Sequence, residues 1–398
     1  MYFKKGFAMA KKRNQNAKCV KTFRNCIDCF SYHNEASGKA PLNNITFFLG
    51  AGFSYAWDKK YPLGTKLFEI DFENLLFDER YEFFKAFCEY CGFAKKMQYD
   101  EFASLYYRLQ MMKRHTFLQG RFWDKYALER VEKEIRLYVA KSFKETTCFD
   151  FADSDQHFAY KRQNAHIYEF FYKVMSQLTG DAGIPEGIRT NFLTTNYDYI
   201  IENIIDNFIR DVLPYYYYSY RGFTPNIANG SIQCVCPHDN QNDYPLIKLN
   251  GGFEIFKDGN SFSLDYRDES SLVFKKQPPE IILPCQEQVY DTDYFKEIFP
   301  KANRILQETD VLFISGYSFP KEDGLIRFLL KQFAESMRDG QNKAVFYVDY
   351  DRHGIENNLK KRIQEIFPNF KRNRIFCYTK GFASFAKEFN KLKAAYEI

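Results

Sequence analysis

The segment from Ile45 to Ser54 constrains the fold of this chain more than any other part of the sequence. Apolar residues, mostly β-branched or aromatic, run up to Leu49 and lead directly into Gly50-Ala51-Gly52, after which a helical pattern begins. This order is typical of a buried strand, a tight turn and a helix N-terminus, where glycines allow close approach and N–H groups favour an anion. The segment predicts a dinucleotide phosphate site on this turn. The alternative is a purely structural glycine turn.

The length and composition of the chain bound the fold class. With 398 residues, one large domain with an insertion and two smaller domains are both open. Aromatic residues make up 19% of the chain, so Phe and Tyr are expected to supply much of a large core. No apolar run approaches the roughly 20 residues of a membrane-spanning helix, and no apolar segment follows the basic N-terminus as in a signal peptide. We therefore expect a cytoplasmic protein that does not associate with membranes.

Much of the net charge of +5 lies near the N-terminus. Because residues 1–40 are polar and basic without clear periodicity, we predict that they form a basic N-terminal extension, with the remaining domain over residues 41–398. Such an extension suits contact with nucleic acid or an acidic partner, and the alternative is a solvated leader. Nucleic-acid binding is expected only through this segment, whose basic residues are Lys4, Lys5, Lys11, Lys12, Arg13, Lys18, Lys21 and Arg24.

The ten cysteines raise the question of a metal site. Cys26 and Cys29 are spaced C-x-x-C, as are Cys88 and Cys91, whereas Cys234 and Cys236 are spaced C-x-C. A zinc ribbon would need two such pairs brought together. Cys88 and Cys91 lie in an aromatic, helix-like segment, where core thiols are the simpler interpretation. We expect no metal, and no disulfides in a cytoplasmic protein.

The pattern of apolar residues changes along the chain. From about residue 65 to residue 180 the apolar spacing is helical, which predicts a helical block inserted after the first strand–helix unit. Short apolar runs then alternate with helical patterns, and such alternation predicts a parallel sheet covered on both faces, as in Rossmann-like α/β folds. The expected strands lie at residues 190–195, 245–249, 281–284, 311–315, 344–349 and 374–378.

Polar residues and glycines follow several of these strands directly. Ligands of parallel sheets bind beyond the carboxyl ends of the strands, so the side chains at these ends are expected to converge on one site. Their convergence strengthens the prediction of a dinucleotide site. The residues concerned are Gly50, Asn196, Asn250, Gly316 and Asp349.

Four short motifs in this order resemble those of SIR2-like proteins, and most closely the bacterial NAD-hydrolysing branch found in anti-phage defence. The resemblance covers about residues 43–350, and both the helical block and the lack of a paired-cysteine zinc module suit this branch better than the protein deacylases. The motifs are Gly50-Ala51-Gly52-Phe53-Ser54, Thr194-Thr195-Asn196-Tyr197-Asp198, Lys248-Leu249-Asn250-Gly251, and Gly316-Tyr317-Ser318-Phe319 with Asp323.

The resemblance implies an NAD+ glycohydrolase, with NAD as substrate, that releases nicotinamide and ADP-ribose. Asn196, Asn250 and Asp198 are the implied catalytic residues, and the asparagine at position 196 helps to bind and cleave at the nicotinamide ribose. We add Asp349 from its place at a strand end, where it can accept a hydrogen bond from a ribose hydroxyl. The implied NAD-binding residues are Gly50, Ala51, Gly52 and Ser54 at the phosphates, Thr195, and Gly316 and Ser318 at the adenosine.

Asn250 departs from the family pattern, which usually has histidine in Lys-Leu-His-Gly. An asparagine amide is not a base near neutral pH, so a catalytically silent NAD or ADP-ribose sensor, or a scaffold subunit, is the alternative function. Natural divergence and an introduced substitution are both compatible with the sequence. His238 and Glu254 are candidates to replace the histidine, and each is otherwise interpreted as a surface or loop residue.

An unregulated NAD hydrolase would harm its own cell. We therefore expect activity to depend on a homo-oligomer or on a partner defence protein. The inserted helical block, rich in Phe and Tyr, is the expected interface.

Overall fold

The computed structural model describes most of the chain. Cys29, Cys234, Cys236 and His238 lie outside the described residues, as does the start of the basic extension. The described residues are 15–28, 43–64, 66–71, 78–93, 96–120, 122–146, 164–177, 188–212, 226, 228–229, 244–266, 277–335 and 343–392.

A six-stranded parallel sheet forms the centre of the molecule, with the strand order β11-β10-β9-β1-β4-β6. The chain runs outward from β1 through β4 to β6, then crosses to β9 and continues outward to β11, so the topological switch point lies between β1 and β9. The sheet confirms the predicted Rossmann-like α/β fold. Its strands are β1 (Asn43–Leu49), β4 (Ile188–Thr194), β6 (Leu246–Lys248), β9 (Val311–Ser315), β10 (Ala344–Val348) and β11 (Ile375–Tyr378).

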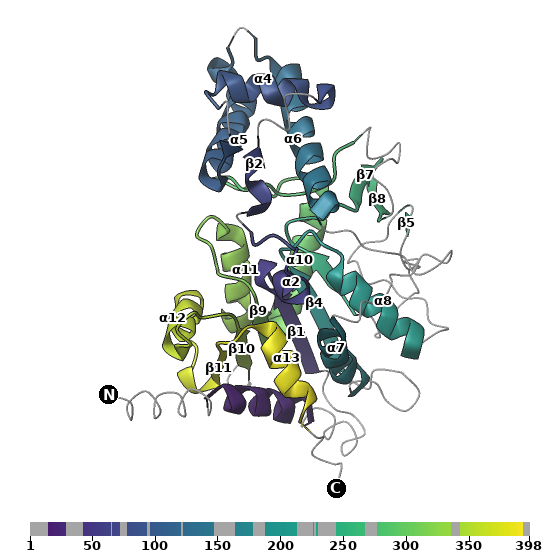
Figure 1. Ribbon diagram of the computed structural model, residues 1–398, viewed down its shortest axis with the longest axis vertical. Helices are drawn as coiled ribbons and strands as arrows, with labels where there is room; N and C mark the ends of the chain where they lie inside the picture. The colour runs from purple at the N-terminus through teal and green to yellow at the C-terminus, as the bar shows by residue number, and fades with distance from the viewer. Residues whose placement is uncertain are drawn as a thin grey trace.

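Helices cover both faces of this sheet (Figure 1). One face carries α7 (Ala165–Gln177), α13 (Phe382–Asn390) and a helix over residues 15–28. The opposite face carries α10 (Asp293–Glu308), which contacts β1, and α11 (Gly324–Glu335), which packs against α10. On the first face, α2 (Ala51–Trp57) packs against α13 and α8 (Ile200–Val212) packs against α7, whereas α12 (Glu356–Ile366) packs against α11.

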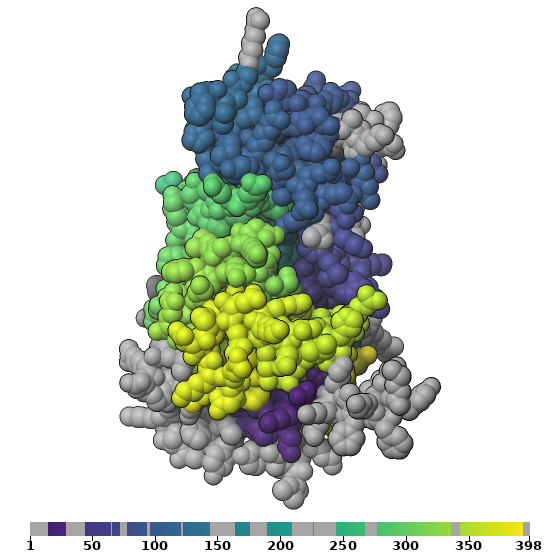
Figure 2. Space-filling model, turned by 90° about the vertical axis from the view of Figure 1, so that its left-hand side faces the viewer, coloured from purple at the N-terminus to yellow at the C-terminus, as the bar shows by residue number. Residues whose placement is uncertain are grey.

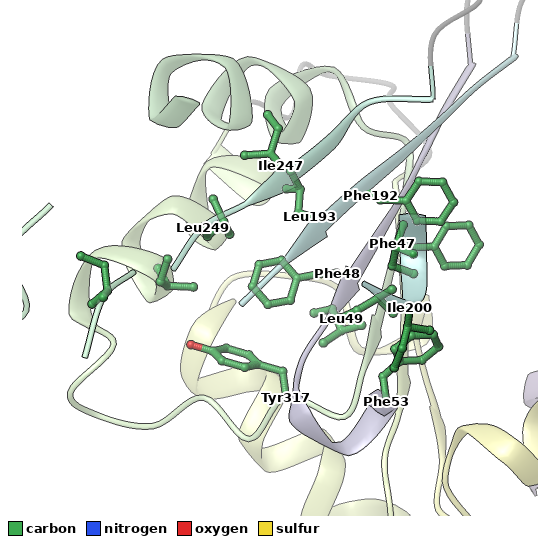
Figure 3. Packing of buried hydrophobic residues seen from close by; sticks show 14 of the residues in the cluster. Phe47, Phe48, Leu49, Phe53, Phe192, Leu193, Ile200, Ile247, Leu249 and Tyr317 are labelled. Carbon is green, nitrogen blue, oxygen red and sulfur yellow. The ribbon is translucent and has the colours of Figure 1, made fainter. Parts of the chain in front are cut away.

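The alternation of side chains along β1 explains the aromatic composition. Phe47 packs against Phe192 and Phe313 of the neighbouring strands and against aromatic rings of α7, whereas Phe48 packs on the other face against Tyr317. Figure 3 shows the rings of Phe47 and Phe48 on opposite sides of β1. Aromatic pairs of this kind contribute beyond their buried area, so Phe and Tyr replace aliphatic residues as core bulk.

The helix over residues 15–28 differs from the predicted basic extension. Its apolar side chains at Cys19, Val20, Phe23 and Ile27 are buried, and Phe23 packs against rings of the sheet, α7 and α13. Arg24 is buried and paired with Asp28 at 2.9 Å, which removes it from any nucleic-acid surface. Figure 2 shows this purple helix beneath the yellow C-terminal region. In the sequence, the frequent lysines of this segment obscure the helical spacing of its buried apolar residues.

The inserted block forms a helical lobe, defined here as residues 66–146, which stands above the sheet in Figure 1. Its helices α4 (Glu82–Tyr90), α5 (Tyr99–Arg114) and α6 (Lys125–Thr146) pack around their own apolar core. Cys88 is buried in this core, and burial raises the pKa of its thiol and that of Cys91. The lobe also contains η1 (Lys66–Phe68), β2 (Ile70–Asp71), η2 (Glu79–Tyr81), β3 (Lys96–Met97) and η3 (Thr116–Leu118).

Two further features differ from the sequence-based expectations. The helix α7, which was expected within the insertion, packs on the sheet against α13 because its aromatic residues complete that layer. The expected strand at 281–284 forms only an isolated bridge between Ile281 and Gly251.

A small separate sheet contains β5 (Ala228–Asn229), β7 (Ile255–Asp258) and β8 (Ser261–Asp265). Within the described residues, no helix is long and apolar enough to span a membrane.

Candidate functional site

A cavity of about 350 Å³ lies beyond the carboxyl ends of the strands, beneath the helical lobe. Leu67, Phe68, Tyr99 and Phe143 of the lobe contribute to its lining. The structure therefore brings residues from four separate motifs to one cavity. The sequence-predicted residues among its lining are Ala51, Gly52, Ser54, Thr195, Asn196, Asp198, Asn250, Gly316, Ser318 and Asp349. Gly50 is buried and does not line the cavity.

The glycines of the first motif pack against the loop that follows β9. The N–H of Gly50 donates to the carbonyl oxygen of Ser315, and the N–H of Gly52 donates to that of Gly316, both at 2.9 Å. A Cβ on either glycine would come within 2.7 Å of Gly316 backbone atoms. These glycines are therefore needed for close contact between two loops at the switch point, and their N–H groups are used within the protein.

Gly316 is the residue of this contact that tolerates substitution least. It has a φ of +66°, and a Cβ there would lie 2.1 Å from the backbone nitrogen of Phe53. Gly316→Ala should lower the free energy of unfolding by at least about 2 kcal/mol, because it combines backbone strain with a clash against backbone. Urea denaturation measures the change. Gly324→Ala is the control, since a Cβ there meets nothing, and equal midpoints for the two variants would contradict the assignment.

Asn196, Ser54 and Asp198 form a connected group at one wall of the cavity. The side-chain amide of Asn196 donates to Ser54 Oγ at 2.8 Å, and that hydroxyl lies 2.5 Å from Asp198 Oδ2. The other carboxylate oxygen of Asp198 accepts from the N–H of Ile200 at the start of α8. Burial raises the pKa of Asp198, and the hydrogen bond from Ser54 opposes this rise. Asp198 thus holds Ser54, which in turn orients Asn196.

A buried ion cluster supports the loop that presents these residues. Lys248 Nζ lies 2.7 Å from Glu202 and 2.9 Å from Glu254, and all three side chains are fully buried. The same ammonium donates to the backbone carbonyl of Asp198 at 2.6 Å. Glu254 is therefore neither a solvated loop charge nor a replacement base in the cavity, contrary to both sequence-based interpretations, because its carboxylate pairs with Lys248.

Removing the central cation should destabilise the fold strongly. Lys248→Met leaves two buried carboxylates without their shared cation, so we expect a loss of about 3–5 kcal/mol in the free energy of unfolding. Lys257→Met is the matched control, because Lys257 pairs with Asp293 at 2.8 Å in an exposed position, where solvent screening leaves such pairs little effect on stability. Chemical denaturation compares them, and similar losses would contradict a structural role for the buried cluster.

Asn250 is held by a segment far along the chain. Its side-chain oxygen lies 3.1 Å from the hydroxyl of Tyr290, and its backbone carbonyl accepts from the N–H of Ile282. The Tyr290 hydroxyl also lies 2.8 Å from Gln288 Oε1. Asn250 is 8% exposed, so its amide is fixed at the cavity wall.

Asp349 marks the opposite end of the cavity. Its Oδ2 accepts from the hydroxyl of Tyr347 at 3.0 Å and from Arg362 at 3.2 Å, while Oδ1 accepts from the N–H of Tyr350. Burial raises its pKa, and these donors oppose the rise. A second cavity of about 710 Å³ adjoins the first here. Residues that line both are Gly52, Leu63, Gly316 and Asp349.

Several lining residues had no role in the sequence-based prediction. Asp323, Gln288 and Tyr317 line the cavity, and the hydroxyl of Tyr317 donates to Asp323 Oδ2 at 2.6 Å. Tyr317 and Asp323 belong to the fourth motif, so this motif was the available signal in the sequence. Gln288 had none. Among the described residues, no group of three or more potential metal ligands occurs.

A family model described as a SIR2-like domain matches residues 190–368 of this chain. The matched region begins within β4, after the glycine turn and the helical lobe, and ends just after α12. It contains Asn196, Asn250, Gly316 and Asp349, the residues at four of the strand ends. No curated protein sequence matches the chain.

Proposed function

We propose that this protein is an NAD+ glycohydrolase that cleaves NAD+ to nicotinamide and ADP-ribose. The SIR2-like match supports an NAD-related function in general. One observation supports the proposal most. A cavity lies at the switch point of a parallel sheet, and Asn196, Gly52 of the glycine turn and Gly316 all line it.

The two adjoining cavities suit a ligand with two halves. We place the nicotinamide ribose near Asn196, Thr195 and Asn250, inside the cavity beneath the helical lobe. The pyrophosphate then passes Ala51 and Gly52 at the boundary. The adenosine half extends past the other boundary residues, with Gly316 and Ser318 along its path and Asp349 beside a ribose hydroxyl. Gly50 and Ser54 shape this path through their bonds to protein groups.

The reaction breaks the bond between the ribose C1′ and the nicotinamide nitrogen. The electron pair leaves with nicotinamide, which becomes neutral, and the ribose acquires oxocarbenium-like character. Water adds to C1′ and loses a proton, giving ADP-ribose. Asn196 is proposed to orient the ribose, since its side chain is fixed by Ser54. The apolar side chains of the lobe, such as Phe68 and Phe143, shield this step from bulk water.

The biological setting that we propose is an effector of bacterial anti-phage defence, controlled by self-association or by a partner defence protein. Phe117 and Phe122 on the helical lobe are 82% and 83% exposed, and they provide apolar surface for such an interface. Dependence of activity on protein concentration or on an added partner would support this control.

Asn250 favours a second candidate, a catalytically silent sensor of NAD or ADP-ribose. Incubating the purified protein with NAD+ at high protein concentration, and following nicotinamide by chromatography, separates the two functions. Nicotinamide release supports the hydrolase. Saturable NAD+ binding in calorimetry without release, including in the presence of candidate partners, would leave the sensor as the function.

A further inference from the structure

Asn250 lines the cavity together with a buried carboxyl group, that of Asp323. The hydroxyl of Tyr290 lies between the side-chain oxygens of Asn250, at 3.1 Å, and Gln288, at 2.8 Å. Asp323 lines the same cavity, and its Oδ2 accepts from the hydroxyl of Tyr317 at 2.6 Å. Asn250, Gln288 and Asp323 all line the cavity. Asn250, which stands where the family usually has histidine, and the Asp323 carboxyl therefore line the same cavity.

Two other carboxylates that line the cavity, Asp198 and Asp349, have partners that leave them less suited to accept a proton. Both oxygens of Asp198 accept hydrogen bonds, one of them from the N–H that begins α8. Asp349 forms an ion pair with Arg362, which favours its charged form. Among the described residues, no ion pair within 4.0 Å involves Asp323, although it is only 6% exposed.

The surroundings of Asp323 raise the pKa of its carboxyl above the usual range. Burial raises its pKa, and hydrogen bonds from Tyr317 and Gln288 together with the charge of Arg327 lower it, whereas Glu322 raises it. The other titratable groups that face Asp323 are three tyrosines: Tyr99 of α5, Tyr197 after β4 and Tyr290 before α10. The guanidinium of Arg327 is itself bonded to the carbonyl of Phe319.

We propose that Asp323 is the general base of NAD+ cleavage in this chain, in place of the histidine that Asn250 replaces. As water attacks C1′, the new C–O bond forms while the bond to nicotinamide breaks, and the Asp323 carboxylate accepts the proton from water. The proton then passes to solvent, so NAD+ and water give nicotinamide, ADP-ribose and a proton. This inference rests on the proposed NAD+ glycohydrolase function and names the base at its site.

Asp323→Asn tests the inference, because the amide keeps the shape of the side chain and an oxygen for the Tyr317 hydroxyl. Nicotinamide release should fall about 10²–10⁴-fold, the usual contribution of a general base, while NAD+ binding and the denaturation midpoint stay close to those of the unmodified protein. Asp310→Asn is the matched control. Burial also raises the pKa of Asp310, but that residue lies at the amino end of β9, away from the cavity.

The pH profile gives a second measurement that a structural role would not change. Only the charged carboxylate is a base, so the rate of the unmodified protein should rise as pH increases through the pKa of Asp323. This rise should disappear in Asp323→Asn and persist in Asp310→Asn. An Asp323→Asn variant with full activity and the same pH profile would overturn the inference and leave the proposed hydrolase intact. NAD+ binding by the unmodified protein without any nicotinamide release would overturn both.

Discussion

Replacing Asn196 by alanine should reduce nicotinamide release by at least about 100-fold while the protein stays folded and still binds NAD+. The side chain lies at the carboxyl end of β4, is 9% exposed, and lines the cavity beneath the helical lobe. Its amide is oriented by Ser54, which Asp198 holds in place. Truncation removes one hydrogen bond within the protein, worth about 1 kcal/mol, and leaves the bond between Ser54 and Asp198.

A matched variant on the same strand separates catalysis from stability. Asn191 is buried in β4, and its amide donates to Thr46 Oγ1 at 3.3 Å, but it does not line the cavity. Asn191→Ala should cost a similar amount of stability and keep the rate of nicotinamide release, as measured by chromatography after incubation with NAD+. Full activity in Asn196→Ala, or equal loss in both variants, would show that Asn196 has no role in the reaction.

The sheet and the convergence of its strand ends were predictable from sequence because buried parallel strands carry a strong local signal. The apolar run before Gly50 and the run at 311–315 are the central neighbours β1 and β9. Chain topology alone brings the residues after such strands together. For this reason the sequence alone predicts one site for Asn196, Asn250 and Gly316, although they are far apart along the chain.

Long-range contacts between polar side chains leave no local signal in the sequence comparable to that of a buried strand. The hydroxyl of Tyr290 holds Asn250 from forty residues away, in a segment without regular structure. Glu254 resembles a loop charge in sequence, yet it is buried by its pairing with Lys248. Similarly, the helix over residues 15–28 is amphipathic, and its burial depends on α7, in the middle of the chain, and on α13, near its C-terminus.

The glycine turn shows that the same residues can be predicted correctly in position and incompletely in role. A strand, a sharp turn and a helix do follow one another at Gly50, as the sequence indicates. The N–H groups of Gly50 and Gly52, however, donate to the carbonyl oxygens of Ser315, the last residue of β9, and of Gly316. Contact between two loops at the switch point is a property of the tertiary fold, and no pattern within ten residues encodes it.

Asn250→His should increase nicotinamide release, and the size of the increase depends on Asp323. The imidazole would occupy the cavity wall beside the Tyr290 hydroxyl and can accept a proton from water or from a ribose hydroxyl. Where Asp323 already serves as base, the gain in an otherwise unmodified protein should be modest. In the Asp323→Asn background, which lacks that base, the same substitution should restore about 10²–10⁴-fold.

The unmodified protein, the two single variants and the double variant form a double-mutant cycle. This cycle measures the coupling between positions 250 and 323, which neither single variant reveals. In the background without Asp323, the restored rate should rise with pH through the imidazole pKa, about 6.5 when unperturbed, because only the neutral ring is a base. Steady-state rates of nicotinamide release across pH 5 to about 8 test this dependence. Equal gains in both backgrounds would show that Asp323 is not the base that replaces the histidine. No gain in either, with NAD+ still bound, would favour the sensor over the hydrolase.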